Sequence, residues 1–347
     1  MIESDNIKID VSSSVYYLTE VYQGVVSSSN LEVELPPMVS ISNGWGNSSN
    51  TTFFDPDSNL EYIEELKGLK LIYLSYTEHK FYHIIYKFQI DLKKEFSGLS
   101  SDLRLLIGMA PYGGIAVWVR GFNKSILIDW LKGIEIEVEM ADFHPVNPDI
   151  TLQEYCDFYI NNDSNVKENL KTNGLPPRNL FDKYMQQFTY RYLLQFEKWN
   201  DSVEEWQKYN EDEIQPEFEY IEESLYDGTH DKLHDDGLLK YHEAGKPKKL
   251  AIKWHIKKSE YTAYFWFDEE KTCLIFERFY GAHPDTKTDF IIRIDAENKK
   301  YELALFRQGL KEPQIIPEDA YQLLVFKNKF EDYRSDNYNQ ERGAWIW

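Results

Sequence analysis

The chain has 347 residues, which at the usual domain size predicts two domains or three. Its 59 aspartates and glutamates outnumber 38 lysines and arginines, so the net charge is −21 at pH 7. This charge excludes the function classes that hold nucleic acid or anionic lipid through basic surfaces. The 20 phenylalanines, 25 tyrosines and 9 tryptophans can bury a large core, which excludes a chain disordered throughout.

Two cysteines, Cys156 and Cys273, are too few for a disulfide framework or a four-cysteine zinc site, and they favour a reducing compartment. The first residues have no basic start and no apolar run, so we expect no signal peptide. The longest apolar stretch, 105–119, is shorter than a membrane span and is interrupted by Pro111. We therefore expect a cytoplasmic protein without a membrane segment.

The N-terminal part, residues 1–145, predicts a β-rich unit. Residues 69–76 and 80–88 are rich in β-branched and aromatic types and predict a hairpin that turns at 77–79. A short helix is expected over 89–97, where apolar residues share one face. Four strands are then predicted, at 103–109, 114–120, 124–130 and 134–140.

The middle part, residues 146–245, predicts helices and is strongly acidic. Apolar spacing indicates one helix from 152 to a stop at Gly174 and another over 179–189. A third is expected to begin at Ser202, because Ser202 and Glu205 have capping-box spacing. Between positions 201 and 243 there are fifteen acids and three lysines, a net charge of −12. This segment is therefore expected at the surface.

The C-terminal part, residues 246–347, repeats the order of the N-terminal part at an offset of about 180 residues. It predicts a hairpin, a helix and then strands, at 249–256, 260–267, 268–280, 288–294, 300–306 and 321–327. The repeat indicates an internal duplication, although two unrelated sheets can share so common an order. The predicted fold class is α+β, with two mainly antiparallel β units that flank a helical, acidic middle segment.

The residues closest to a metal motif are His230 and His234, four positions apart, with His242 as a further ligand. A metalloprotease needs a glutamate after the first histidine, and this chain has Asp231 there. The surrounding residues are hydrophilic and turn-like, which favours a solvated acidic loop. We therefore predict no metal, no cofactor and no catalytic residue.

Three groups of residues are candidates for contact with a partner. Trp45, between two glycines, is either an exposed anchor or a cap on the core. Tyr333 and Arg334 lie in a polar C-terminal segment that is either a partner-contacting arm or an extension packed on the protein. The third group consists of acids that would speed the encounter with a basic surface: Glu211, Asp212, Glu213, Glu217, Glu219, Glu222 and Glu223.

Several phrases of the sequence form a distinctive set: Asn-Gly-Trp-Gly at 43–46, Leu-Ser-Tyr-Thr-Glu-His-Lys-Phe-Tyr at 74–82, Gly-Met-Ala-Pro-Tyr-Gly-Gly at 108–114, Val-Trp-Val-Arg-Gly at 117–121, Gly-Leu-Pro at 174–176, Phe-Asp-Lys-Tyr at 181–184 and Phe-Glu-Asp-Tyr-Arg-Ser-Asp-Asn-Tyr-Asn-Gln at 330–340. Together they resemble a bacterial family, the domain-of-unknown-function family 2931 in its Bacteroidetes form. The resemblance implies a gene beside secreted antibacterial toxins, including lipase-type effectors of type VI secretion. It carries over no catalytic residues. Some relatives resemble lipoproteins, whereas this chain has no anchoring cysteine near position 1.

Relatives in the resembled family are read as immunity proteins, so the resemblance implies a non-enzymatic immunity protein that neutralises a cognate effector by occluding its active site. The acidity of the chain adds the expectation that this effector has a basic surface. The first alternative is a carbohydrate- or small-ligand-binding β module, which predicts coplanar Trp or Tyr rings on one sheet surface. The second is an unrecognised metal-dependent hydrolase, which predicts that His230 and His234 converge in a pocket with a carboxylate.

Overall fold

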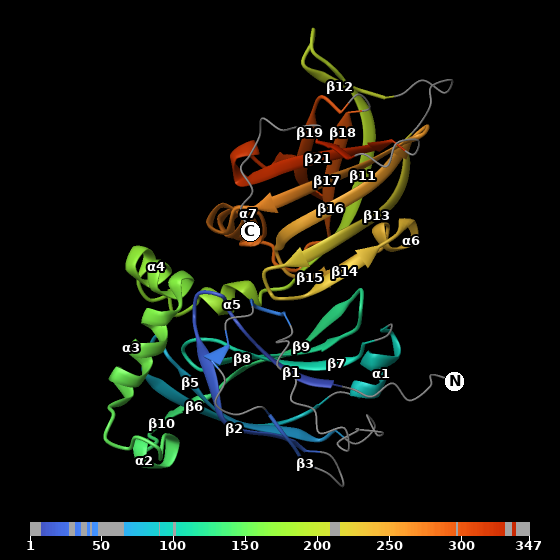
Figure 1. Ribbon diagram of the computed structural model, residues 1–347. Helices are drawn as coiled ribbons and strands as arrows, with labels where there is room; N and C mark the ends of the chain where they lie inside the picture. The colour runs from blue at the N-terminus through green and yellow to red at the C-terminus, as the bar shows by residue number, and fades with distance from the viewer. Residues whose placement is uncertain are drawn as a thin grey trace. The chain divides into compact units, whose positions relative to one another are not determined.

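The computed structural model describes residues 8–27, 32–35, 40–41, 44–47, 66–89, 91–99, 102–208, 216–295, 298–329 and 335–337. The chain divides into two compact units. Unit 1 consists of residues 1–185 with 227–229, and unit 2 of residues 186–226 with 230–347. The fold is α+β with mainly antiparallel sheets, as predicted (Figure 1). No helix in the described residues is both long enough and apolar enough to span a membrane.

Unit 1 contains two sheets. Sheet 1 has the strand order β1 (Lys8–Ser13), β7 (Arg104–Met109), β8 (Gly114–Arg120) and β9 (Ser125–Lys132), with β1 parallel to β7. Sheet 2 has the order β10-β6-β5-β2-β3, and β4 also pairs with β2. Its strands are β2 (Thr19–Ser27), β3 (Glu32–Glu34), β4 (Ser40–Ile41), β5 (Gly68–Ser75), β6 (Lys80–Lys87) and β10 (Ile134–Ile136).

The core of unit 1 lies between the inner faces of these two sheets. Val11 and Ile107 from sheet 1 and Leu71 and Tyr73 from sheet 2 belong to one buried cluster. Alternate residues of each strand point inward, which is the pattern of a β-sandwich. The helix α1 (Leu92–Ser97) connects the two sheets in sequence, and Asp91 caps its N-terminus.

Helices cover the outer face of sheet 2. They are α2 (Met140–Phe143), α3 (Leu152–Asn162) and α4 (Ser164–Asn173). A second cluster joins Tyr76 and Phe81 of the sheet side to Phe143 and Tyr155 of the helices. The helix predicted from residue 152 is two helices, because Asp163 caps a new one, and its stop at Gly174 is confirmed. A short helix, α5 (Leu180–Tyr184), follows.

Unit 2 also contains two sheets, sheet 3 and sheet 4. Sheet 3 has the order β12-β11-β18-β19-β20, with β15 paired to β11, and sheet 4 has the order β14-β13-β16-β17-β21-β22. The strands are β11 (Phe188–Asn200), β12 (Glu205–Gln207), β13 (Glu217–Leu225), β14 (His230–Leu233), β15 (His242–Ala244), β16 (Pro247–Ile256), β17 (Ser259–Phe267), β18 (Thr288–Asp295), β19 (Tyr301–Arg307), β20 (Gln314–Ile315), β21 (Tyr321–Lys329) and β22 (Ser335–Asn337). A core shared by the two sheets and α7 (Glu269–Tyr280) includes Trp254, Phe276 and Ile292. Two short helices, α6 (Asp235–Leu238) and η2 (Glu318–Ala320), complete the unit.

The two units have corresponding strand orders. In each, a hairpin (β5–β6 or β16–β17) is followed by a helix (α1 or α7) and an antiparallel pair (β7–β8 or β18–β19). In each, the first strand, β1 or β11, pairs in parallel with the strand after the helix. One register shift interrupts the pairing of β2 with β5, between Val21 and Gln23. Two interrupt the pairing of β13 with β16, between Phe218 and Tyr220 and between Ser224 and Leu225, and the first of these lies near the start of its strand, as in β2.

The prediction of a helix that begins at Ser202 is wrong. Residues there form the connection between β11 and β12, and Trp199 lies opposite Trp206 with ring centroids 5.3 Å apart. A separation of seven residues fits either two helical turns or a hairpin pair, and in this chain the hairpin forms. The middle segment 146–245 is thus helical only as far as Tyr184 and is mostly strand from Phe188 onward.

Candidate binding site on the outer face of sheet 1

Several family-like phrases meet on the outer face of sheet 1. The Trp45 ring lies 5.0 Å from Trp118 and 4.9 Å from Phe181, centroid to centroid, in edge-to-face contacts. Trp118 is fully buried, and its indole Nε1 donates to the carbonyl of Asp227 at 3.1 Å. Gly108 lies beneath both tryptophans, because a Cβ there would meet the Trp118 ring at 2.4 Å. These residues form one packed cluster.

Other family-like phrases meet at Glu78. Its carboxylate accepts hydrogen bonds from Ser75 Oγ at 2.8 Å, Tyr82 Oη at 2.8 Å and the backbone N–H of Tyr112 at 2.6 Å. The Tyr112 hydroxyl donates in turn to the carbonyl of Pro176 at 2.9 Å. Glu78 therefore ties the turn of the β5–β6 hairpin to the turn between β7 and β8, which is a structural role.

Three basic residues lie side by side at one end of sheet 1. Lys8 is the strand partner of Arg104, and Arg104 is the strand partner of Arg120. Their neighbours Leu105 and Val119 point into the core, so the basic side chains lie on the outer face.

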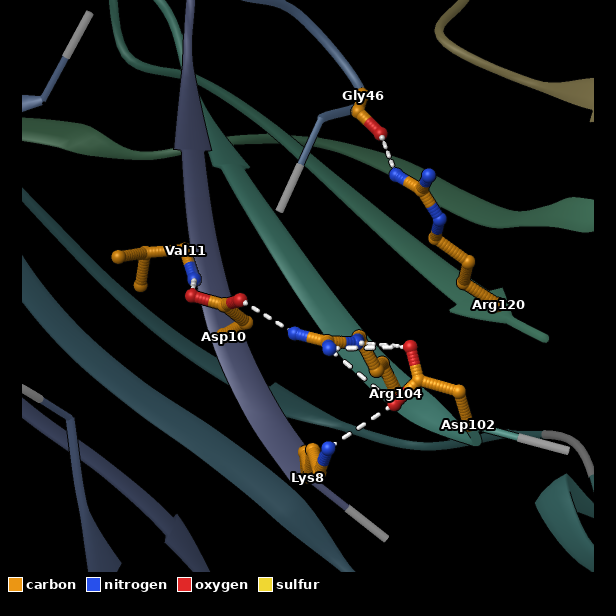
Figure 2. Close-up of polar contacts among 7 residues, drawn as sticks. All are labelled: Lys8, Asp10, Val11, Gly46, Asp102, Arg104 and Arg120. Carbon is orange, nitrogen blue, oxygen red and sulfur yellow. Dashed lines mark hydrogen bonds and ion pairs between the residues drawn. The ribbon is translucent and has the colours of Figure 1, made fainter. Parts of the chain in front are cut away.

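Two carboxylates are paired with two of these cations (Figure 2). Arg104 binds the buried Asp10 through Nη1 at 3.1 Å, and it binds Asp102 through Nε at 3.0 Å and Nη2 at 3.1 Å. Lys8 Nζ also lies 3.0 Å from Asp102. Partial burial opposes ionisation of Asp102, but hydrogen bonds from Lys8 and Arg104 lower its pKa. Arg104 is therefore held by two acids at once.

Arg120 has a different environment. Its Nη1 donates to the carbonyl of Gly46 at 3.0 Å, and within the described ranges no carboxylate is paired with it (Figure 2). Burial lowers the pKa of Arg120, and the nearby charge of Arg104 lowers it further, while Asp102 and Asp10 partly compensate. The guanidinium is half-buried, and among the described residues its side-chain hydrogen bond is to a neutral carbonyl.

An exposed aromatic ring follows two residues later. Gly121 and Lys124 close the β8–β9 turn through a backbone hydrogen bond of 2.8 Å. Phe122, within this turn, has 70% of its surface exposed. The turn thus presents an apolar ring beside the end of the strand that carries Arg120.

Comparison with known proteins places this site in a family. Residues 5–177 match the family described as "Protein of unknown function (DUF2931)". The chain belongs to the DUF2931 family through this region. The predicted family is thereby confirmed over a region that ends before the family-like phrase at 181–184. No curated protein and no solved structure matches the chain. The DUF2931 region contains the whole of sheet 1, including Arg104 and Arg120.

Trp45, a predicted partner contact, lies in the DUF2931 region and packs onto its own unit. The ring is half-buried and contacts Trp118, Trp130 and Phe181. Its Nε1 is buried and has no hydrogen-bond partner in the part of the chain that the structure describes. The other predicted aromatic contact, Tyr333, and its neighbour Arg334 lie outside the described residues.

The predicted acidic contacts do not form one group. Glu217 and Glu222 are exposed on β13, and Glu219 is paired with Lys253 at 3.2 Å and with His255 at 2.7 Å. Glu223 is 4% exposed and accepts a hydrogen bond from Tyr192 at 2.5 Å. A carboxylate at this depth does not face an approaching protein, so Glu223 is removed from the predicted set. The remaining three acids, Glu211, Asp212 and Glu213, lie outside the described residues.

The histidines of the predicted metal motif contact different groups. His230 lies on strand β14, so His230 and His234 do not share a helix face. His234 Nδ1 lies 3.0 Å from the carbonyl of Glu219, whereas His242 Nε2 lies 3.6 Å from the Glu223 carboxylate. The segment predicted as a solvated acidic loop instead contains strand β14 and the short helix α6.

In the part of the chain that the structure describes, a different group of potential metal ligands comes together. Glu219, His255 and Glu260 each offer a ligand atom within 4.8 Å of the others. The ammonium of Lys253 lies 3.2 Å from Glu219 and 2.9 Å from Glu260. A lysine already supplies the positive charge that a metal ion would bring, so this set is explained as an ion-pair network.

The outer face of sheet 4 carries aromatic rings. Tyr264 and Trp266 are stacked, with centroids 5.4 Å apart and planes 24° apart, and Phe326 lies 5.8 Å from Tyr264. The ammonium of Lys249 lies 5.0 Å from the Tyr264 ring and 5.6 Å from the Trp266 ring. These rings are half-buried and share one face of strand β17 and its neighbour.

A carboxylate is buried between sheet 2 and its helices. Glu20 is 1% exposed and accepts hydrogen bonds from the hydroxyls of Tyr76 and Tyr155. Burial raises the pKa of Glu20, and the two tyrosine hydroxyls partly offset this effect. In the same layer, burial raises the pKa of Cys156 to about 12, which keeps the thiol protonated and unreactive.

Proposed function

We propose that this DUF2931 protein is a non-enzymatic, cytoplasmic immunity protein that neutralises a secreted antibacterial effector of the type VI kind by covering its active site. The observation that carries the proposal is Phe122, 70% exposed on a closed turn beside the half-buried Arg120. Aromatic and arginine side chains supply most of the binding energy in protein interfaces. A partner that covers the Phe122 ring would therefore gain about 1.5–3 kcal/mol of binding free energy from its burial.

The charge of the chain supports a protein partner with a basic surface. A net charge of −21 repels nucleic acid and anionic membranes, and it attracts a basic protein over distances longer than contact. Exposed acids such as Glu217 and Glu222 would attract the partner during diffusional encounter, before contact. Mutation of such charges changes the association rate and its salt dependence more than the dissociation rate.

The test is neutralisation of the effector encoded beside the gene. The chain, co-expressed with that effector, is expected to restore growth and to bind it in vitro. Phe122→Ser is expected to raise the dissociation constant about 10–100-fold, because one apolar anchor is lost. Phe158→Ser is the matched control, since Phe158 is 62% exposed on α3 in the same unit. Equal affinities for the two variants, or an effector that stays toxic, would refute the proposal.

A second candidate is a carbohydrate- or small-ligand-binding module in unit 2. It is favoured by the stacked Tyr264 and Trp266 on the outer face of sheet 4, with Lys249 over both rings. Trp266 fluorescence should then change on addition of a sugar, and Trp266→Ala should abolish that change. An unaltered spectrum across a glycan panel would remove this candidate.

We also infer that the two units arose by internal duplication. The corresponding strand orders and the parallel pairing of β1 with β7 and of β11 with β18 support it. A register shift near the start of both β2 and β13 agrees with it. Superposition of residues 69–121 on 249–309 should align hairpin, helix and strands with the same hand. Opposite hands would contradict a common origin.

A further inference from the structure

We propose that Arg120 binds one carboxylate group, presented by the protein partner on a surface that is otherwise neutral or basic. The inference rests on the proposed function, which it deepens by naming the chemistry of the contact. Its first test measures the binding of a free carboxylate, so the result does not depend on any effector.

The first argument is the unused hydrogen-bonding capacity of Arg120. A guanidinium has five N–H groups, and the structure assigns one of them, from Nη1 to the carbonyl of Gly46. Arg104, the strand partner of Arg120, instead directs three N–H groups to Asp10 and Asp102. Figure 2 shows contacts from both carboxylates to Arg104 and none from either to Arg120. Lys8 and Arg104 are both paired with described carboxylates, whereas Arg120 is not, so we assign the external carboxylate to Arg120.

The second argument is the charge of the side chains drawn in Figure 2. Among these described residues, Lys8, Arg104 and Arg120 carry three positive charges and Asp10 and Asp102 carry two negative ones, so this group has a net charge of +1. One carboxylate neutralises this charge, whereas a phosphate dianion would leave an excess negative charge. The chain as a whole carries −21, so a strongly acidic partner would be repelled before contact. A single acid on a neutral or basic surface satisfies both conditions.

The third argument is the rigidity of the support. The loop that holds Gly46 is fixed by Asn47, whose N–H donates to the carbonyl of Gly44 at 2.9 Å, and by Ser12, whose hydroxyl donates to the same carbonyl at 3.0 Å. Gly46 has φ of +77°, and a Cβ there would lie 2.2 Å from the carbonyl oxygen of Gly228. The guanidinium is therefore oriented before binding, which lowers the entropy lost when an anion binds.

The experiment is a titration of the full chain with acetate, against chloride at equal ionic strength, followed by NMR of the arginine side-chain N–H groups. Wild type is expected to bind with a dissociation constant on the order of 10–100 mM, the strength of one charged hydrogen-bonded contact. Arg120→Gln should lose the response. Arg120→Lys keeps the charge and a donor for Gly46, so it should fold normally and bind acetate several-fold more weakly, because lysine lacks the planar fork.

The control is Arg278→Gln, which removes one exposed arginine of α7 and should leave the titration unchanged. Circular dichroism of each variant checks folding. Absence of acetate binding to the wild type would overturn the inference, whether or not an effector is neutralised. Phosphate binding tenfold tighter than acetate would overturn the assignment of a monoanion.

The second arm uses the effector of the proposed function. Arg120→Gln should weaken the complex about 10–100-fold, mainly through faster dissociation. Acetate binding together with an undiminished effector complex would show that Arg120 binds only small anions, which overturns the partner contact. Acetate binding in a protein that no effector recognises would refute the proposed function and not the carboxylate site.

Discussion

Gly108→Ala tests the packing that supports the candidate site. The added Cβ would lie 2.4 Å from two ring atoms of Trp118 and 3.1 Å from Trp45. The Trp118 ring cannot move aside freely, because Trp45 packs against it and its Nε1 is hydrogen-bonded to Asp227. Overpacking of this kind costs about 1–3 kcal/mol. For a unit of 150–250 residues, this lowers Tm by roughly 2–12 °C.

The assay is thermal unfolding followed by near-ultraviolet circular dichroism, which reports the tryptophan environment. Gly98→Ala is the matched control: a Cβ there meets only the Glu95 carbonyl at 3.8 Å, so Tm should not fall. In a Trp118→Phe background, the atoms that clash with the new Cβ are absent, and Gly108→Ala should cost less by about 1–3 kcal/mol. Equal Tm values for the two glycine variants, or no coupling with Trp118, would refute the reasoning.

Three further predictions concern the buried and paired groups. The pKa of Glu20 is raised in the folded state from its ordinary value of 4.5. As the pH rises, the unfolded chain therefore releases this proton before the folded protein does. Stability should therefore fall as pH rises from 4.5 through the folded-state pKa, and Glu20→Gln should remove this part of the pH profile in urea titrations. Cys156, fully buried with a pKa of about 12, should resist iodoacetamide at pH 8 and react only after unfolding, as mass spectrometry would show. Lys253→Ala should expose Glu219 and Glu260 to zinc, which calorimetry should detect in the variant and not in the wild type.

The candidate site was found in sequence only in part. The phrase Val-Trp-Val-Arg-Gly at 117–121 belongs to the predicted family pattern and carries Arg120, yet no local pattern distinguished this arginine from Arg104. Asp10 and Arg104 are 94 residues apart in sequence, so their pairing depends on the parallel contact of β1 with β7. That pairing occupies Asp10 with Arg104 and leaves Arg120 without a described carboxylate partner. Only the tertiary structure shows this difference between the two arginines.

Local sequence determined those helices and strands whose apolar spacing and whose flanking residues predict the same structure. The hairpins β5–β6 and β16–β17, the helix α7 and the stop at Gly174 formed as predicted, because short-range hydrogen bonds and side-chain alternation suffice there. The structure adds that Asp268 caps α7. The tertiary structure decided the rest. Trp199 and Trp206 pair across a hairpin, because β11 gains a parallel partner, β18, about 100 residues later. Glu223 of β13 is buried and accepts a hydrogen bond from Tyr192 of β11. Such pairings depend on contacts between distant segments, whose free energy no local window of the sequence contains.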